Sequence, residues 1–142
     1  ARRRAHVGRF NPMIYSLLVL SPPHSGQGAS TAVQFARAAI SRGHSIHRVF
    51  FLDQGTYNAC AAQVTRQDES DTLQPWVDLA QESNVELVLC IASALQRGLI
   101  DSTEARRYDK QAATIHPAFV ISGLGQLVDA SAASERMITF GC

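Results

Sequence analysis

The strongest constraint on the fold of this chain is an alternation of short apolar runs with longer segments of helical periodicity. This order is typical of βαβ units, in which a helix crosses over the sheet and returns the chain to a parallel strand. The apolar runs are nearly continuous, which indicates strands that are covered on both faces. The sequence therefore predicts an α/β fold, a single three-layer α/β/α domain with a five-stranded, mainly parallel sheet.

Strands are expected at Met13–Leu20, Ser45–Leu52, Val85–Leu89, Ala118–Gly123 and Arg136–Phe140. Helices are expected at Ala29–Gly43, Thr72–Ser83, Ile91–Gly98, Thr103–Ala112 and Leu124–Ser134. A shorter helix is expected within residues 54–63, before a charged loop at residues 65–71. Asp101 or Ser102 caps the fourth helix, and Glu104 is the capping-box acid if Asp101 is the cap.

Composition narrows the class of protein. The chain has 142 residues, of which 46% are hydrophobic and 18% charged, as expected of one globular domain. No apolar run reaches the length of about 18 residues that a membrane span needs. The three cysteines, Cys60, Cys90 and Cys142, form neither a CxxC pair nor a zinc spacing. We therefore expect no disulfide framework and no metal site, and a reducing, cytoplasmic setting.

The basic residues are unevenly distributed. Residues 1–12 contain four of the thirteen basic residues and no acidic ones, which leaves nine basic against twelve acidic residues elsewhere. A body with this balance lacks the basic surface of a nucleic-acid-binding domain. Because Met13 stands at the start of the first expected strand, residues 1–12 are expected to be an extension outside the fold, disordered or left over from an expression tag. A functional basic arm is the alternative, and residues 13–142 form the domain.

The chemistry of such a fold is expected at one edge of the sheet. In open parallel sheets, ligands and reactive groups gather outside the carboxyl ends of the strands. The segments that follow the strands are Ser21–Gly28, Asp53–Cys60, Cys90 itself and Gly123–Gly125. Candidate site residues are therefore sought in these four places.

The loop Ser21–Gly28 resembles a phosphate-binding loop only superficially. It lacks the lysine of that motif, and Gly26 and Gly28 have no third glycine at the dinucleotide-binding spacing. A flexible turn is the simpler interpretation. An anion or small-ligand site built from N–H groups at the start of the next helix is the alternative, and it would suit a non-catalytic binding subunit.

The histidines offer one candidate base. His44 and His47 lie at the entry to the second strand and His116 lies before a proline, so structural roles are expected for these three. His24 lies in the loop after the first strand. If the first and third strands are neighbours, His24 approaches Cys90 and a Cys–His pair results; a solvent-facing side chain is the alternative.

Cys90 stands where an apolar strand meets a helix. If the helix begins at Ile91 or Ala92, the free N–H groups of its first turn and its positive dipole end converge on the sulfur. Such surroundings favour a thiolate over a thiol and suit a persulfide anion equally. An inert core cysteine is the alternative. Cys60 is expected to be a small packing residue, and Cys142 a frayed terminal residue.

Four segments in this order resemble the DsrE/TusD family of sulfur-relay proteins. They read FARAAISRGHSIHRVFFLDQGTYNA, CIASALQRGLIDSTEA, FVISGLGQLVDAS and RMITF. The resemblance runs from about Met13 to Phe140 and implies a DsrE-like fold. It also implies a persulfide on Cys90, within a C-x-x-[AS]-[AL]-x-R-G pattern that Cys90–Gly98 fits, and no metal or redox cofactor. His24, Ser25, Tyr57, Asn58 and Gly123 are expected to line the pocket, with turn geometry and packing as the alternative for the last three.

The resemblance further implies a hetero-oligomer with TusB-like and TusC-like subunits. A TusA-like protein would donate sulfur and a TusE-like (DsrC-like) protein would accept it, on the way to the 2-thiouridine of a tRNA wobble base. Neither direct nucleic-acid binding nor a membrane is implied. A DsrE-type role in sulfur oxidation is the alternative. Two features depart from the family: Cys60 occupies a position that is usually not cysteine, and the SPPHSG loop differs.

Overall fold

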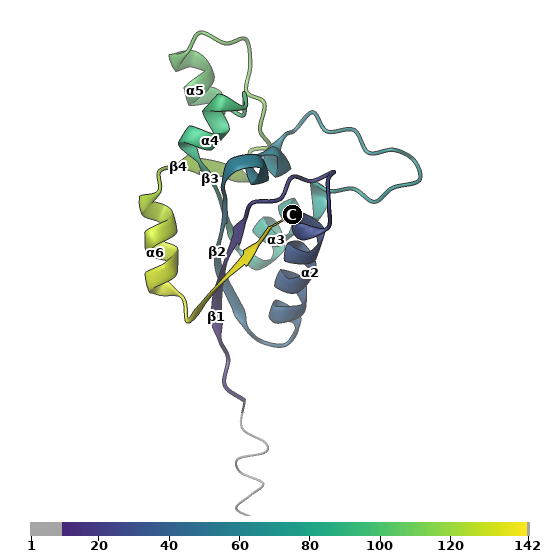
Figure 1. The fold of residues 1–142 in the computed structure, drawn as a ribbon, viewed down its shortest axis with the longest axis vertical. Coiled ribbons are helices and arrows are strands. Elements are labelled where there is room, and N and C mark those ends of the chain that lie inside the picture. Colours follow the sequence, from purple (N-terminus) through teal and green to yellow (C-terminus); the bar gives the residue numbers. More distant parts are fainter. Residues whose placement is uncertain (1–9, 142) are drawn as a thin grey trace, which may run out of the picture.

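The computed structural model describes residues 10–141, and all strands of its sheet are parallel (Figure 1). The strands are β1 (Ile14–Val19), β2 (Ser45–Phe51), β3 (Glu86–Cys90), β4 (Phe119–Ser122) and β5 (Arg136–Phe140). The helices are α2 (Gly28–Ser41), the 3-10 helix η1 (Asp53–Ala59), α3 (Gln74–Ser83), α4 (Ile91–Gln96), α5 (Ser102–Arg107) and α6 (Gly125–Ala133). The predicted α/β fold with a five-stranded sheet is confirmed, and the strand order is β4-β3-β2-β1-β5.

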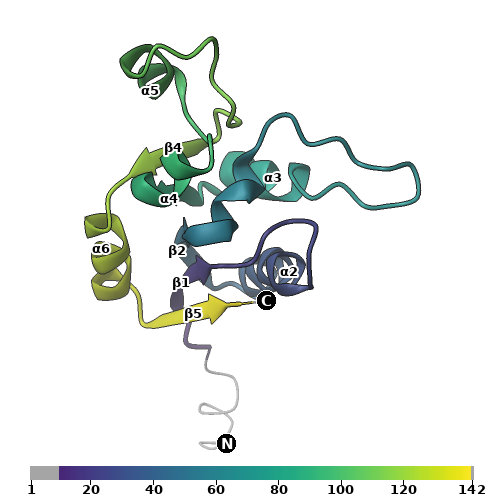
Figure 2. The same cartoon turned by 45° about the horizontal axis from the view of Figure 1, so that its top comes forward.

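Helices cover both faces of the sheet, as Figure 2 shows. Side chains alternate between the faces along each strand. In β1, Leu17 and Val19 point into the larger core under α2 and α3, whereas Leu18 packs on the opposite face, where α6 lies. Right-handed crossovers explain this division, because β1, β2 and β3 advance in one direction while the chain returns from β4 to β5 in the other.

The larger core is built around aromatic contacts that join α3 to the sheet. The ring of Phe51 on β2 meets Trp76 at 5.0 Å between centroids and Phe119 on β4 at 5.5 Å. Both contacts are edge-on, the arrangement that aromatic quadrupoles favour. All three side chains are buried. The expected helix at Thr72–Ser83 therefore forms with its apolar side against the strands, although it begins two residues later, at Gln74.

The chain leaves β3 and β4 toward opposite faces of the sheet. After β3, Ala94 of α4 and the following Leu99 join the larger core. After β4, α6 crosses the other face, and its Leu127 packs there. In open parallel sheets, ligands gather at the carboxyl ends of neighbouring strands whose connections diverge in this way. Cys90, the last residue of β3, lies at this divergence.

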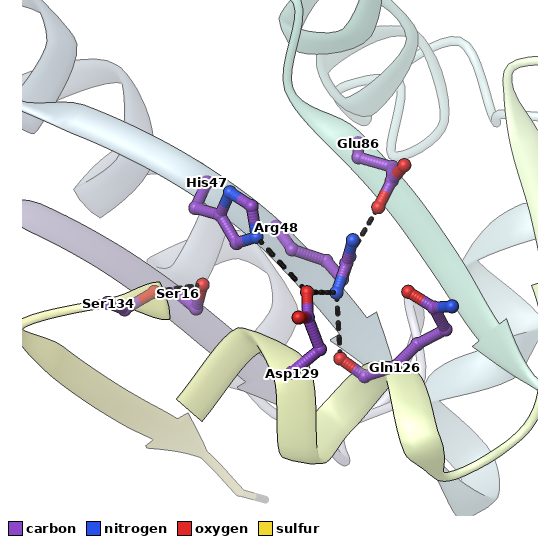
Figure 3. A network of polar contacts seen from close by, with 7 residues as sticks. All are labelled: Ser16, His47, Arg48, Glu86, Gln126, Asp129 and Ser134. Atoms are coloured by element: carbon purple, nitrogen blue, oxygen red, sulfur yellow. Dashed lines mark hydrogen bonds and ion pairs between the residues drawn. The ribbon is translucent and has the colours of Figure 1, made fainter. Parts of the chain in front are cut away.

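A buried arginine connects α6 to the sheet (Figure 3). The side chain of Arg48 on β2 is 8% exposed. Its Nη1 donates to the carbonyl oxygen of Gln126 at 2.8 Å and to Oδ2 of Asp129 at 2.9 Å. Its Nε donates to the carboxylate of Glu86 on β3. A buried guanidinium needs such partners, because removing a partner leaves its charge buried without compensation.

This arginine makes part of the stability dependent on pH. The hydrogen bond from Arg48, more than its charge, holds the pKa of the Asp129 carboxyl below its ordinary 3.8. A carboxyl with a depressed folded pKa stabilises the fold above its unfolded pKa, and this stabilisation is lost as pH falls through the folded value. We expect the difference in unfolding free energy between wild type and Asp129→Asn, from urea denaturation, to be present at about pH 5 and to vanish toward about pH 2. A difference that stays constant over this range would contradict the assignment.

The structure corrects the expected helix at Thr103–Ala112. Asp101 is indeed the cap of α5, since its Oδ1 accepts the N–H of Glu104 at 2.8 Å. The carboxylate of Glu104 does not complete the capping box and instead accepts from Arg107 at 3.3 Å. The helix ends at Arg107, and Asp109 then adopts a left-handed φ of 56°. A non-glycine residue in that conformation interrupts helical geometry, so the segment is shorter than its periodicity indicates.

The described part of the N-terminal extension lies against the domain. Residues 1–9 and Cys142 are outside the described range, so the expectations for them remain predictions. The ring of Phe10 is 5.2 Å from that of His44. His44 also accepts the N–H of Met13 through Nδ1 at 2.9 Å, in keeping with a structural role. Within residues 10–141, no helix has the length and apolar character needed to cross a membrane.

Candidate functional site

Cys90 is both the last residue of β3 and the N-cap of α4. Its backbone is still extended, with φ −62° and ψ 122°, and it pairs with Ser122 of β4. The strand predicted to end at Leu89 therefore continues for one residue. The expected direct junction between strand and helix is present, because Ile91 is already helical.

The residues that directly follow Cys90 form the first turn of α4. The N–H groups of Ile91 and Ala92 have no acceptor within the helix, as in any first helical turn. The Cys90 side chain makes no capping hydrogen bond to them. Ala92 is exposed and Ile91 partly buried. Because α4 has only six residues, these individual N–H groups matter more than a summed helix dipole.

The sulfur of Cys90 lies within an apolar cluster. The residue is 3% exposed and is buried together with Phe50 and Val88. Leu18, Leu52 and Leu127 are partly buried and pack against these three. Little of this residue is therefore accessible to a reagent in this conformation.

A hydrogen bond between the segments that follow β2 and β3 positions α4. The N–H of Asp53, the first residue after β2 and Leu52, donates to Oγ of Ser93 in α4 at 3.0 Å. Asp53 has a left-handed φ of 52°, a conformation that is costly outside glycine. Arg97 then donates to the carbonyl oxygen of Ser93 at 3.1 Å. Sequence reasoning missed this link, and the available signal was that Asp53 and Ser93 both follow the carboxyl ends of expected strands.

The approach of His24 to Cys90 was conditional on neighbouring first and third strands, and this condition is not met; His24 is exposed, as the alternative predicted. β2 separates β1 from β3, so the two strands are not neighbours. His24, Ser25 and Tyr57 instead line a hollow of about 300 Å³. Its walls also include Cys60 but not Cys90. Three of the predicted pocket residues are therefore brought together, around a different cysteine.

Cys60 has the packing role expected of it. It is partly buried and packs against the larger core. Its backbone forms an isolated antiparallel bridge with Ile115. These contacts join the end of η1 to the segment before β4, which is a structural role.

The last two predicted pocket residues have structural surroundings. Asn58 is fully buried, and its Nδ2 donates to the carbonyl oxygens of Ser21 at 2.9 Å and Gly55 at 2.8 Å. These bonds hold η1 against the chain that leaves β1. Gly123 lies in the exposed turn between β4 and α6, and a Cβ there would meet nothing within 4 Å. Packing and turn geometry therefore account for both.

In the Ser21–Gly28 loop, Gly28 is required because the backbone of another segment packs closely against it. A Cβ on Gly28 would lie 2.0 Å from the carbonyl oxygen of Gly141, so this position excludes any side chain. The N-cap of α2, Gln27, makes no side-chain capping bond, and no acidic residue stands in the first turn. The loop lines a hollow of about 650 Å³ opposite a segment that contains Arg66. Among residues 10–141, no group of three or more His, Cys, Asp or Glu side chains is placed to hold a metal ion.

The fold is shared with a solved structure. The ychN protein from E. coli superposes with a TM-score of 0.70, over 92% of this chain and 100% of that one. The two sequences are 15% identical, so this likeness concerns the fold alone.

Sequence relatives cover almost the whole chain. Sulfurtransferase TusD of Serratia proteamaculans is 40% identical over 126 residues, which are 89% of this chain and 98% of the relative. Sulfurtransferase TusD of Salmonella typhi is 41% identical over 128 residues, 90% of this chain and 100% of the relative. A relative from Allochromatium vinosum that carries the name DsrE is 40% identical over 129 residues, which are 91% of this chain and 99% of the relative. The model of the DsrE/DsrF-like family matches residues 13–140, and the chain therefore belongs to this family.

Proposed function

We propose that this chain is a sulfurtransferase subunit of a sulfur relay and that it carries sulfane sulfur as a persulfide on Cys90. The observation that carries the proposal is the position of Cys90 between β3 and α4, where the connections from β3 and β4 diverge. The relatives named sulfurtransferase TusD, 40% identical over nearly the whole chain, support the same activity.

The reaction consists of two successive transfers of one sulfur atom, each from a persulfide to a cysteine thiolate. The Cys90 thiolate attacks the outer sulfur of a donor persulfide, a bond from Cys90 Sγ to that sulfur forms, and the donor's own S–S bond breaks. The electron pair of the broken bond leaves with the donor thiolate, so no oxidant or reductant is consumed. An acceptor cysteine then attacks the outer sulfur on Cys90 and restores its thiolate. The rates depend on thiolate fraction, leaving group and access.

Two backbone groups are assigned to the charged states of this cycle. The thiolate and the persulfide are anions, and burying an anion without donors is costly. The N–H groups of Ile91 and Ala92 begin α4 directly after Cys90 and are free of helical partners. We assign them the stabilisation of the persulfide anion, with Ser93 and Asp53 positioning the turn.

The similarity to TusD proteins suggests the surrounding relay. In this proposal the chain assembles with TusB-like and TusC-like subunits, takes sulfur from a TusA-like donor and passes it to a TusE-like acceptor. The relay then ends in tRNA wobble 2-thiouridine, in the cytoplasm, where thiols stay reduced. The similarity to DsrE of Allochromatium vinosum supports a sulfur-oxidation relay as the second candidate.

Mass spectrometry tests the carrier step directly. The full chain is incubated with a persulfide donor, alkylated, digested and analysed peptide by peptide. We expect one added sulfur on the peptide that contains Cys90, and its loss after treatment with a reductant. The peptide that contains Cys60 serves as the internal control, because that thiol is partly accessible but has a packing role.

The outcomes separate cleanly. Sulfur on Cys90 alone supports the proposal. Sulfur on Cys60 alone would move the carrier to the hollow that His24 and Tyr57 line. No added sulfur on either peptide, in the folded chain with its partner subunits present, would refute the carrier role.

A further inference from the structure

We propose that α6 covers the Cys90 sulfur and that sulfur exchange requires the N-terminal half of this helix to lift, with Leu127 determining how readily it does so. The inference rests on the proposed function, since it concerns access to the same sulfur. It is motivated by a conflict between the burial of Cys90 and the approach that a second thiol needs.

Leu127 is the helical part of the cover. Among the described residues of the cluster around Cys90, Leu18, Phe50 and Val88 belong to strands, and Leu52 directly follows one. Leu127 alone comes from a helix. The sheet cannot open without breaking its hydrogen-bonded ladders, whereas a helix can separate by losing side-chain contacts. The element most easily displaced from the sulfur is therefore α6.

α6 is weakly packed for a helix that covers a sheet. Ala130 is its one buried residue within the described chain. Leu124, just before the helix, and Val128 within it are 56% and 69% exposed. Elements with few buried apolar contacts open locally at a lower free energy than the core does.

The two ends of the helix are attached differently. Just after its C-terminal end, Oγ of Ser134 lies 2.6 Å from Oγ of Ser16, and the N–H of Glu135 donates to the carbonyl oxygen of Ile14 at 2.7 Å. Nearer the N-terminal end, the polar attachment runs through Arg48, and Leu127 supplies the apolar contact. The helix can therefore swing about the junction at Ser134, provided that the bonds to Arg48 break.

The test measures the accessibility of the Cys90 thiol and not sulfur transfer. The full chain is pulsed with iodoacetamide, and the alkylation rates of Cys90 and Cys60 are read from their peptides. Alkylation through a rare open state is proportional to the population of that state. Because partial burial of a leucine is lost, we expect Leu127→Ala to raise the Cys90 rate about tenfold with the Cys60 rate unchanged. The matched control Val128→Ala alters an exposed neighbour on α6 and should leave both rates unchanged.

A second variant tests the attachment through Arg48 without creating a cavity. Asp129→Asn alters an exposed side chain, 59% accessible, that accepts from Arg48. We expect a selective rise of the Cys90 rate by about threefold, since a charged hydrogen-bond partner is replaced by a neutral one. Asp78→Asn is the matched control, because Asp78 pairs with Arg37 between α2 and α3 on the opposite face of the sheet.

The inference is overturned if Leu127→Ala leaves the Cys90 rate at the wild-type value. If that variant accelerates both thiols equally, the whole fold has loosened and Asp129→Asn decides: without selective acceleration there, α6 is not the cover. These rates are independent of any sulfur donor. A failure of the cover would therefore leave sulfur loading on Cys90 intact, and a failure of sulfur loading would leave the rates as expected.

Discussion

A Cys90→Ser variant is expected to accept no sulfur from a persulfide donor, with transfer falling to the background of the donor alone. A serine hydroxyl is not ionised near neutral pH and cannot form a persulfide. The Cys90 side chain makes no capping hydrogen bond to the first turn of α4, so a serine oxygen in the same position would lie unpaired among Phe50, Val88 and Leu127. We therefore expect the unfolding free energy to fall by about 1–3 kcal/mol, the usual cost of an unpaired buried polar group. Sulfur loading is followed by mass spectrometry and stability by urea denaturation.

Two further variants complete this experiment. Cys60→Ser removes the other described thiol and should retain full sulfur loading. Cys90→Ala should lose loading without burying a hydroxyl, which separates the chemical from the structural effect. Transfer that persists in Cys90→Ser and Cys90→Ala but disappears in Cys60→Ser would reassign the carrier.

The largest loss of stability is expected from Gly55→Ala. Gly55 is a buried residue of η1, and a Cβ there would lie 2.0 Å from the carbonyl oxygen of Val19 in β1. That oxygen also accepts the N–H of Leu52, so it is not free to move away. The destabilisation caused by overpacking is largest where the neighbouring atom is fixed backbone, so we expect the unfolding free energy to fall by about 3 kcal/mol or more. This is a large share of the roughly 5–15 kcal/mol that stabilise an ordinary domain.

Gly125→Ala is the matched control for this substitution. Gly125 is the first residue of α6, and a Cβ there would meet nothing within 4 Å. Alanine is the better helix former, so the unfolding free energy should stay the same or rise by up to about 1 kcal/mol. Thermal and urea denaturation of both variants, compared at one pH, measure the difference. Equal stabilities for the two variants would show that η1 moves away from β1 at little cost.

The strands could be predicted from the sequence because each is an apolar run bounded by turn residues. β5 begins and ends where expected, and each of the other strands differs from its expected bounds by a single residue at one or both ends. The junction at Cys90 was also predictable, since the change from strand to helix is visible in the letters VLCIASAL. Local pattern is sufficient for such features, because neighbouring residues determine them.

The surroundings of Cys90 could not be predicted in the same way. Alternation along β1 indicates which side chains face a core, but it does not reveal that β2 lies between β1 and β3. The condition under which His24 would approach Cys90 is therefore not met, and His24 lines a hollow with Cys60 instead. Leu127, which packs against the cluster that contains Cys90, lies 37 positions further along the chain. The hydrogen bond that holds the first turn of α4 joins Asp53 to Ser93, 40 positions apart. Contacts at such separations are products of topology.

The position of β5 beside β1 has a consequence for folding of the chain during its synthesis on the ribosome. β1 through β4 can pair in the order in which they are made, each beside its predecessor. The free edge of β1 receives its partner only after residues Arg136–Phe140 have been synthesised. Until then an unpaired strand near the start of the chain is open to pairing with other nascent chains. Slow synthesis of the last third of the chain should therefore favour aggregation, and a chaperone that shields this edge should suppress it.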